Sequence, residues 1–139
     1  MNKIARRQRL KTLSNPDESI DYLVTLQTNT KRPFWKIEKT LEVNSVIIEL
    51  RYVPDQLILE ESSLNLYFQN LRNENATSSQ QVGLMMLEDL NNELVPRWLH
   101  LTIITNLHIN GLNHHNKVCF QDQQPNWNNI ALISSSEFT

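Results

Sequence analysis

The sequence is poor in glycine and in cysteine, and each shortage excludes a class of protein. Its 139 residues include two glycines, Gly83 and Gly111, whereas the dinucleotide-binding and P-loop fingerprints need glycines at fixed, close spacing. A classical nucleotide-binding fold is therefore not expected. The single cysteine, Cys119, excludes an internal disulfide bond and fits a reducing compartment.

Long apolar runs and an excess of one charge are also missing. No apolar run reaches the roughly 18 residues of a membrane span, and the amino terminus lacks the apolar segment of a signal peptide, so we expect a cytoplasmic protein. The formal net charge of −2 gives no overall attraction to nucleic acid, which is not an expected partner. With 40% hydrophobic and 20% charged residues, the composition is that of an ordinary globular chain.

Positive charge is nevertheless concentrated at the amino terminus. One interpretation is a basic arm that contacts phosphates or an acidic partner; the other, which we favour, is a frayed and solvated chain end. We divide the chain into a basic amino-terminal arm over residues 1–19, which need not be ordered, and a single domain over residues 20–139. The basic residues of the arm are Lys3, Arg6, Arg7, Arg9 and Lys11.

Hydrophobic periodicity predicts an α+β fold. Alternating apolar residues over 20–28 and 43–53 predict two strands that pair as a long antiparallel hairpin, and Pro54 ends the second strand. Apolar spacing over 64–71 predicts an amphipathic helix, and Ser78 with Gln81 has the spacing of a capping box for a second helix that ends before Pro96. Residues 98–109 and 130–134 read as two further strands. The expected order is β-β-α-α-β-β, with both helices on one face of an antiparallel sheet.

This order is the layout of the tunnelling fold, and several ordered motifs support a particular family. The motifs are Y-V-P-D at residues 52–55, E-E-S-S-L-N-L-Y at 60–67, L-R-N at 71–73, D-L at 89–90 and V-P-R-W at 95–98. In these motifs the sequence resembles the NADPH-dependent 7-cyano-7-deazaguanine reductases of queuosine biosynthesis.

The resemblance implies a chemistry for which this chain lacks the side chains. The family attacks a nitrile with a cysteine thiolate and reduces the resulting thioimide with two hydrides from NADPH, while an aspartate donates a proton. Counted back from Tyr52, the cysteine position falls near Ile37 and the aspartate position near Asn44. Neither side chain can replace the group it stands for, so no catalytic residue is assigned.

Other family positions have changed as well. The glutamate that holds the substrate ring falls at about Ser79 or Gln80, a lysine expected near cofactor phosphate is Ser62, and a P-R-G-G turn is replaced around His108. The resemblance therefore implies NADPH only if reductase activity is retained. The candidate ligand-binding residues are Glu60, Ser62, Ser63, Ser79, Gln80 and His108.

A metal site is not expected, although imidazole and thiolate are the usual zinc ligands. The spacing of the histidines matches no standard pattern, and His114 and His115 could share a metal only from a loop, which we expect over residues 110–116. Cys119 is expected to be a small buried hydrophobic residue.

Three functions remain open. The first is a catalytically degenerate homologue of the reductase that binds a purine- or pterin-like ligand or a partner subunit. The second is an enzyme of different chemistry in the same inter-subunit pocket, with Glu60, His108 or the His114-His115 loop as acid or base. The third is a true reductase. Because a four-stranded sheet leaves two unpaired edges, we expect a homo-oligomer or a hetero-oligomer with a catalytic homologue.

Overall fold

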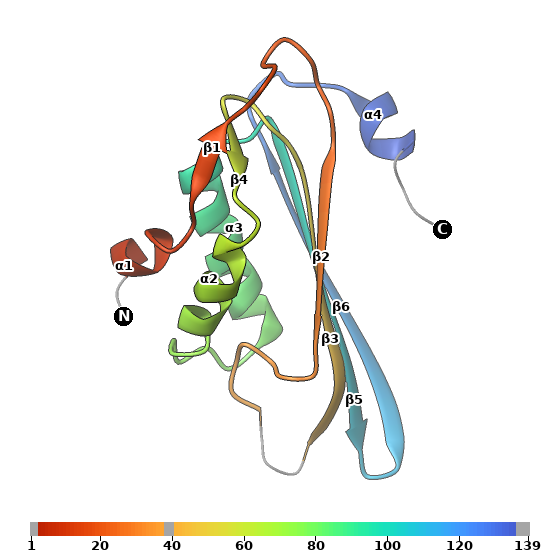
Figure 1. Cartoon of the computed structure of the whole chain (residues 1–139). Helices are drawn as coiled ribbons and strands as arrows, with labels where there is room; N and C mark the ends of the chain where they lie inside the picture. Colours follow the sequence, from red (N-terminus) through yellow and green to blue (C-terminus); the bar gives the residue numbers. More distant parts are fainter. Residues whose placement is uncertain (1–2, 38–40, 136–139) are drawn as a thin grey trace.

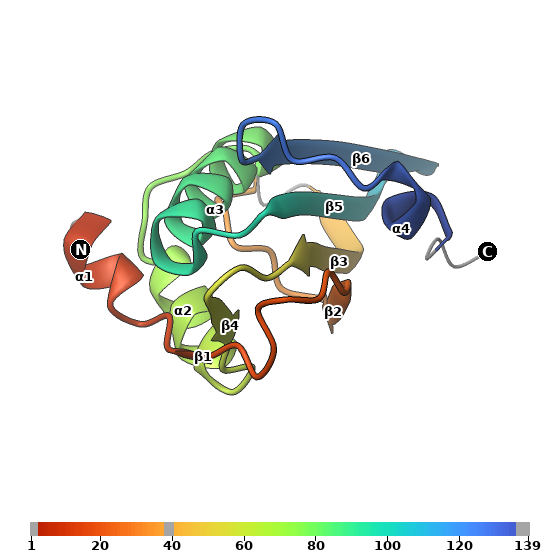
Figure 2. The same cartoon turned by 90° about the horizontal axis from the view of Figure 1, so that it is seen from above.

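The computed structural model describes residues 3–37 and 41–135, which form a four-stranded antiparallel sheet with two helices against one face. The strands lie in the order β2-β3-β5-β6 (Figure 1). Their bounds are Val24–Thr30 for β2, Glu42–Val53 for β3, Trp98–Ile109 for β5 and Leu112–Gln123 for β6. Helices α2 (Ser63–Leu71) and α3 (Ser79–Leu94) lie side by side on one face (Figure 2). The predicted α+β class is confirmed, and the large sheet and its two helices follow the order β-β-α-α-β-β, although the last strand is not the predicted segment.

The core lies between the sheet and these helices. Strand β3 buries alternate residues from Val46 to Tyr52, and β5 buries Leu99, Leu101 and Ile103 on the same face. Helix α2 contributes residues with the predicted i, i+3, i+4, i+7 spacing. Ser78 caps α3 as predicted, since its Oγ accepts a hydrogen bond from the backbone N–H of Gln81 at 3.1 Å. The helical core residues are Leu64, Tyr67, Phe68, Leu71, Val82, Met86, Leu90 and Leu94.

The prediction of a strand over residues 130–134 is wrong, because Ile130–Ser135 form the short helix α4. The fourth strand is β6, which includes the segment expected to be a loop. Asn110 and Gly111 have φ values of 50° and 81° and form a tight turn that folds β6 directly back onto β5, with Ile109 opposite Leu112. Asn-Gly is a strong hairpin signal, but the polar sequence of β6 lacks the alternation on which the strand predictions relied.

The first predicted strand begins later than expected, at Val24 rather than at residue 20. The four residues before it belong to a connection that Asp21 ties to other parts of the chain. The Asp21 carboxylate accepts hydrogen bonds from Arg97 at 2.9 Å and from the indole N–H of Trp127 at 3.2 Å. The pairing with β3 begins at Val24, which lies opposite Tyr52.

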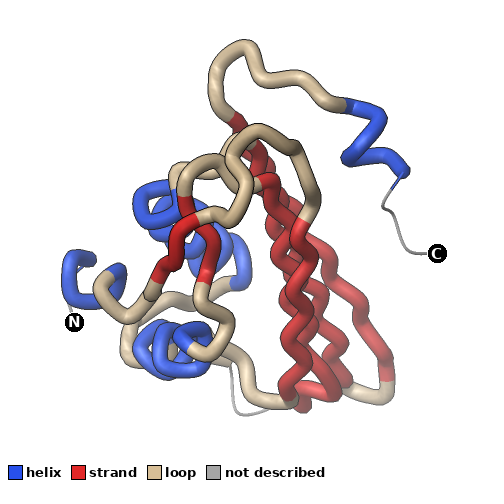
Figure 3. The backbone as a smooth tube through the Cα atoms, turned by 45° about the horizontal axis from the view of Figure 1, so that its top comes forward, coloured by secondary structure: helices blue, strands red, loops and turns tan. Residues whose placement is uncertain are grey.

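The amino-terminal segment differs from the solvated arm that we expected. Residues Lys3–Arg7 form helix α1, and β1 (Thr12–Ser14) pairs with β4 (Leu57–Leu59) in a small separate sheet (Figure 3). Arg6 is only 6% exposed because its guanidinium pairs with Asp89, a fully buried carboxylate on α3, at 2.5 and 2.9 Å. Arg6, together with Arg7, therefore compensates a charge inside the fold.

The second face of the large sheet is polar and is covered at one end by α4. It presents Glu49, Arg51, His100, Thr102 and Cys119 around a hollow of about 470 Å³. We call this surface the polar face. The Nη2 atom of Arg51 donates to the carbonyl oxygen of Ile133 at 2.9 Å, so α4 lies on the side opposite α2 and α3 (Figure 2). Within the described ranges, no helix has the length and apolar composition to cross a membrane.

Candidate functional site

A hollow of about 610 Å³ lies at the end of the molecule where the chain passes from β2 to β3. Its wall consists of residues 31–37, the start of β3 and Arg72, which follows α2. The backbone N–H of Lys36 donates to the carbonyl oxygen of Ala76 at 2.9 Å. This bond fixes the segment before β3 against the connection between α2 and α3. We call this hollow the basal pocket.

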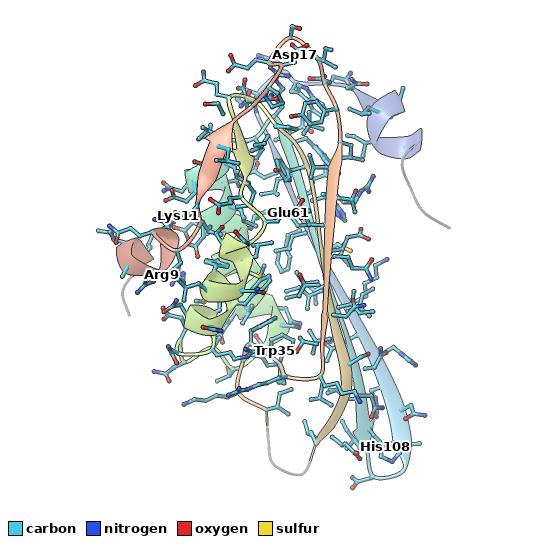
Figure 4. All side chains as sticks on the ribbon, viewed as in Figure 1. Arg9, Lys11, Asp17, Trp35, Glu61 and His108 are labelled. Atoms are coloured by element: carbon cyan, nitrogen blue, oxygen red, sulfur yellow. The ribbon has the colours of Figure 1, made fainter. Side chains whose placement is uncertain are left out.

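Aromatic side chains line the basal pocket and pack against α2 and the core. Phe34 is 2% exposed and stacks on Phe68 of α2, with ring centroids 4.8 Å apart. The Arg72 guanidinium lies 4.5 Å from the centre of the Phe34 ring, a cation–π contact that holds the arginine in place. Trp35 is half-buried against the core and also lines the pocket; Figure 4 shows it between the helices and the sheet.

Positive charge dominates the wall of the basal pocket. Burial, and then the nearby charge of Arg32, lower the pKa of Arg72. Its Nη2 atom donates to the carbonyl oxygen of Arg32 at 3.3 Å. A pocket of this size and mixed lining suits a small planar ligand with an anionic group. The charged residues of the wall are Lys31, Arg32, Lys36, Arg72 and Glu42.

The two family positions expected to carry the chemistry lie in or beside the basal pocket. Ile37, to which the resemblance assigns the position of the cysteine, lines it. Asn44 is exposed on β3, at a register irregularity between Val43 and Ser45, and Val43 also lines the pocket. The structure therefore brings both positions to one end of β3, but with a hydrocarbon side chain and an amide.

The candidate residues at the start of α2 are engaged with one another and with the amino-terminal segment. Glu60 accepts a hydrogen bond from the Ser62 hydroxyl at 2.9 Å. The Ser63 hydroxyl donates to the Glu60 carbonyl oxygen at 2.7 Å and accepts from the backbone N–H of Lys11 at 3.1 Å. Ser62 is the N-cap residue of α2 but makes no side-chain capping hydrogen bond, whereas Ser63 links the start of α2 to the segment before β1.

The remaining candidates are split between two places. Ser79 and Gln80 lie in the first turn of α3, where the Ser79 hydroxyl donates to Gln80 Oε1 at 3.2 Å. His108 lies opposite Glu42 near the end of β5, and its Nδ1 is 3.0 Å from Asn113 Oδ1. The six candidates thus fall at three locations, and none is among the residues that line the basal pocket. Sequence reasoning missed Arg72, whose place above Phe34 depends on tertiary contact.

Histidine and cysteine residues do not converge on a metal site. Across the described residues, no group of three or more His, Cys, Asp or Glu side chains has a metal-binding arrangement. His114 and His115 are successive residues of β6, so their side chains point to opposite faces of the sheet. Cys119 is exposed rather than buried, which corrects our expectation; its Sγ atom is 3.8 Å from Thr102 Oγ1 on the polar face.

Cys119 is also far from the basal pocket along the sheet. It lies opposite Thr102, which in turn lies opposite Glu49. Glu49 is six residues beyond Val43 on β3, a distance of roughly 20 Å at the usual rise of a strand. The cysteine therefore has no route to the position that Ile37 occupies without rearrangement of the sheet.

A β-β-α-α-β-β domain with one helix-covered face and a pocket before its second long strand belongs to the tunnelling-fold class. The sequence model described as "QueF-like protein" matches residues 46–125. The chain is 35% identical over 106 residues to the NADPH-dependent 7-cyano-7-deazaguanine reductase of Thermomicrobium roseum, covering 76% of this chain and 78% of that protein. The enzyme of the same name from Nitrosococcus oceani is 30% identical over 124 residues, covering 89% and 92%. The chain belongs to the QueF-like family.

Proposed function

We propose that this chain is a catalytically degenerate member of the family, which binds a purine- or pterin-like ligand or a partner subunit and does not reduce a nitrile. The observation that supports this most directly is Ile37 in the wall of the basal pocket. Nitrile reduction through a thioimide needs a thiolate, which attacks the nitrile carbon and later leaves. The hydrocarbon side chain of Ile37 has no lone pair with which to form a bond to the nitrile carbon.

The residue that stands for the acid supports the same proposal. An aspartic acid can donate a proton to the thioimide nitrogen, whereas the amide of Asn44 is far too weak an acid to serve as the proton donor. Cys119 does not replace the missing nucleophile, because it lies on the polar face about 20 Å away along the sheet. Nitrile reduction would thus need two separate changes, a nucleophile in place of Ile37 and an acid in place of Asn44.

The chain's residues do not fit NADPH at the position that the resemblance implies. That position is Ser62, an exposed hydroxyl that donates to the Glu60 carboxylate. A carboxylate next to a neutral side chain repels a phosphate group rather than binding it. No step of the proposed function therefore uses NADPH.

Ligand binding is tested by thermal unfolding in the presence of guanine, 7-deazaguanine and a pterin. A ligand at 100 times its Kd stabilises a protein by about 2.7 kcal/mol, so at least one of the three should raise Tm by several degrees. Trp35→Leu should remove the shift, because Trp35 supplies the aromatic wall of the pocket. Trp127→Leu removes a half-buried indole at another site, and this variant should keep the ligand-induced rise in Tm. No shift with any compound would leave only the partner role.

Association with other subunits is the second part of the proposal. Strands β2 and β6 form the two edges of the large sheet, and β6 is exposed along nearly its whole length. Long unpaired edges invite pairing with another chain. We propose a homo-oligomer, or a hetero-oligomer with a relative that retains the cysteine. Native mass spectrometry of this chain, alone and mixed with such a relative, distinguishes the two assemblies.

A further inference from the structure

The basal pocket is lined mainly by positive charges, whereas the whole chain has a small net negative charge. Among the described residues, four basic side chains and one carboxylate line it, in a protein whose formal net charge is −2. Like charges gathered in one concave site raise the local potential and attract anions. The pocket is thus a local exception to the weakly acidic character of the molecule. Its basic residues are Lys31, Arg32, Lys36 and Arg72, and its acid is Glu42.

These basic side chains lack carboxylate partners within the described part of the chain. The ion pairs found there belong to Lys3, Arg6, Arg7 and Arg97, which pair with Asp or Glu at 2.5 to 3.3 Å. The basic residues of the basal pocket are in none of them. By contrast, the buried arginine Arg6 is neutralised by Asp89, whereas Arg72 is in none of the ion pairs of the described residues.

Arg72 has the features of a preorganised anion receptor. Its guanidinium is held by the Phe34 ring at 4.5 Å and by the Arg32 carbonyl oxygen at 3.3 Å. Its Nε atom is buried without a hydrogen-bond partner among the described residues. A partly desolvated cation with an unused donor is costly unless an acceptor with negative charge approaches. The planar fork of a guanidinium matches the oxygens of a phosphate group especially well.

A phosphate ion alone would make no stacking contact with the aromatic side chain of the pocket. Trp35 lines the same pocket, and an indole offers a flat surface on which a heteroaromatic ring can stack. A volume of about 610 Å³ lies within the range of pockets that bind small molecules. We infer that the basal pocket binds a purine mononucleotide, with its phosphate at Arg72 and Arg32 and its base against Trp35. This inference rests on the proposed ligand-binding function and adds that the ligand carries a phosphate group.

Isothermal titration calorimetry at low and at moderate salt tests the inference with GMP, guanosine and inorganic phosphate. GMP should bind at least tenfold more tightly than guanosine at low salt, and the advantage should shrink as salt rises. Arg32→Gln and Lys36→Gln should each weaken GMP binding several-fold and leave guanosine binding unchanged. Both side chains are exposed, so these variants should fold normally.

The matched control is Lys117→Gln, which removes an equally exposed positive charge from β6 at the polar face. It should bind GMP like the unmodified protein. Equal weakening by Lys117→Gln and Arg32→Gln would show general charge attraction and overturn the inference. Equal affinity for GMP and guanosine would overturn the phosphate site but leave the proposed function intact. Binding of neither GMP nor guanosine would overturn the mononucleotide inference and the purine part of the proposed function, and would leave the pterin and partner-subunit roles. Tighter binding of a short single-stranded RNA, with a steeper salt dependence, would overturn the mononucleotide assignment.

Discussion

The buried carboxylate of Asp89 organises the contact between the amino-terminal segment and the helices. It accepts hydrogen bonds from Arg6, from Arg7 at 2.9 Å and from the Tyr67 hydroxyl at 2.6 Å. Burial alone would raise the pKa of Asp89, but the hydrogen bonds from Arg6, Tyr67 and Arg7 outweigh it and hold the pKa below its ordinary value. Burial, and then the adjacent Asp89, raise the pKa of Tyr67 well above its usual range.

Removal of Arg6 should therefore cost far more than removal of a surface charge. Arg6→Ala leaves a buried carboxylate partly uncompensated, and we expect it to lower the free energy of unfolding by about 3 kcal/mol. Lys3→Ala is the matched control, because Lys3 pairs with Glu88 across an exposed contact and should cost less than about 1 kcal/mol. Urea denaturation measures both. Similar, small effects for the two variants would show that Asp89 does not depend on Arg6.

The lowered pKa of Asp89 predicts a pH dependence of stability. A carboxyl whose folded pKa lies below its unfolded value of about 3.9 stabilises the fold above that value. The contribution disappears as pH falls through the folded pKa. Asp89→Asn should be less stable at pH 7 and should lose less further stability on acidification than the unmodified protein. Urea midpoints from pH 7 to pH 3 give this comparison; parallel curves for the two proteins would contradict the assignment.

At the scale of elements, α3 packs against β6 through the missing side chain of Gly83. A Cβ atom at this position would lie 2.1 Å from Cε2 of the Phe120 ring. Helix propensity alone predicts that Gly→Ala stabilises a helix interior by about 1 kcal/mol. Overpacking predicts the opposite sign, a loss of about 1–3 kcal/mol.

We expect overpacking to decide the sign, so that Gly83→Ala lowers the free energy of unfolding. The cost should shrink in a Phe120→Leu background, because the smaller side chain vacates the space that the new methyl group needs. Chemical denaturation of the four proteins in this double-mutant cycle measures the coupling. An Ala variant that is more stable than the parent would show that the α3–β6 contact is looser than the structure has it.

The elements that the sequence predicts well are those with strong periodicity. Strands β3 and β5 and helices α2 and α3 each bury regularly spaced apolar residues. Strand β6 was not predicted because its residues are mostly polar and exposed, and its register depends on the Asn110-Gly111 turn. The amino-terminal helix depends on Asp89, a partner more than 80 residues away in sequence. No local pattern contains that information.

The candidate site, like the fold, was predicted from the sequence only in part. Counting from the Y-V-P-D motif placed Asn44 near the start of β3, because a continuous strand preserves residue spacing. It placed Ile37 before that strand, in the segment that lines the basal pocket. The ligand-binding candidates taken from motifs lie at three separate locations. The basal pocket depends on the stacking of Phe34 between Phe68 and Arg72, residues brought together by tertiary packing, so the sequence alone did not indicate it.

At the scale of the whole molecule, the two unpaired sheet edges predict association. We expect sedimentation velocity to find a species several times the 16.3 kDa mass of one chain, since edge pairing between β2 of one copy and β6 of another would remove both exposed edges. A single species of one-chain mass at all concentrations, without a partner, would contradict the homo-oligomer.

The most direct measurement of the central proposal is cofactor oxidation. The purified chain is incubated with 7-cyano-7-deazaguanine and NADPH, and the absorbance of NADPH is followed, with the Thermomicrobium roseum relative as the positive control. The account predicts no oxidation above that of the Cys119→Ser variant, and no covalent adduct by intact-mass spectrometry. Steady oxidation by the unmodified chain, above all if Cys119→Ser abolishes it, would contradict the account.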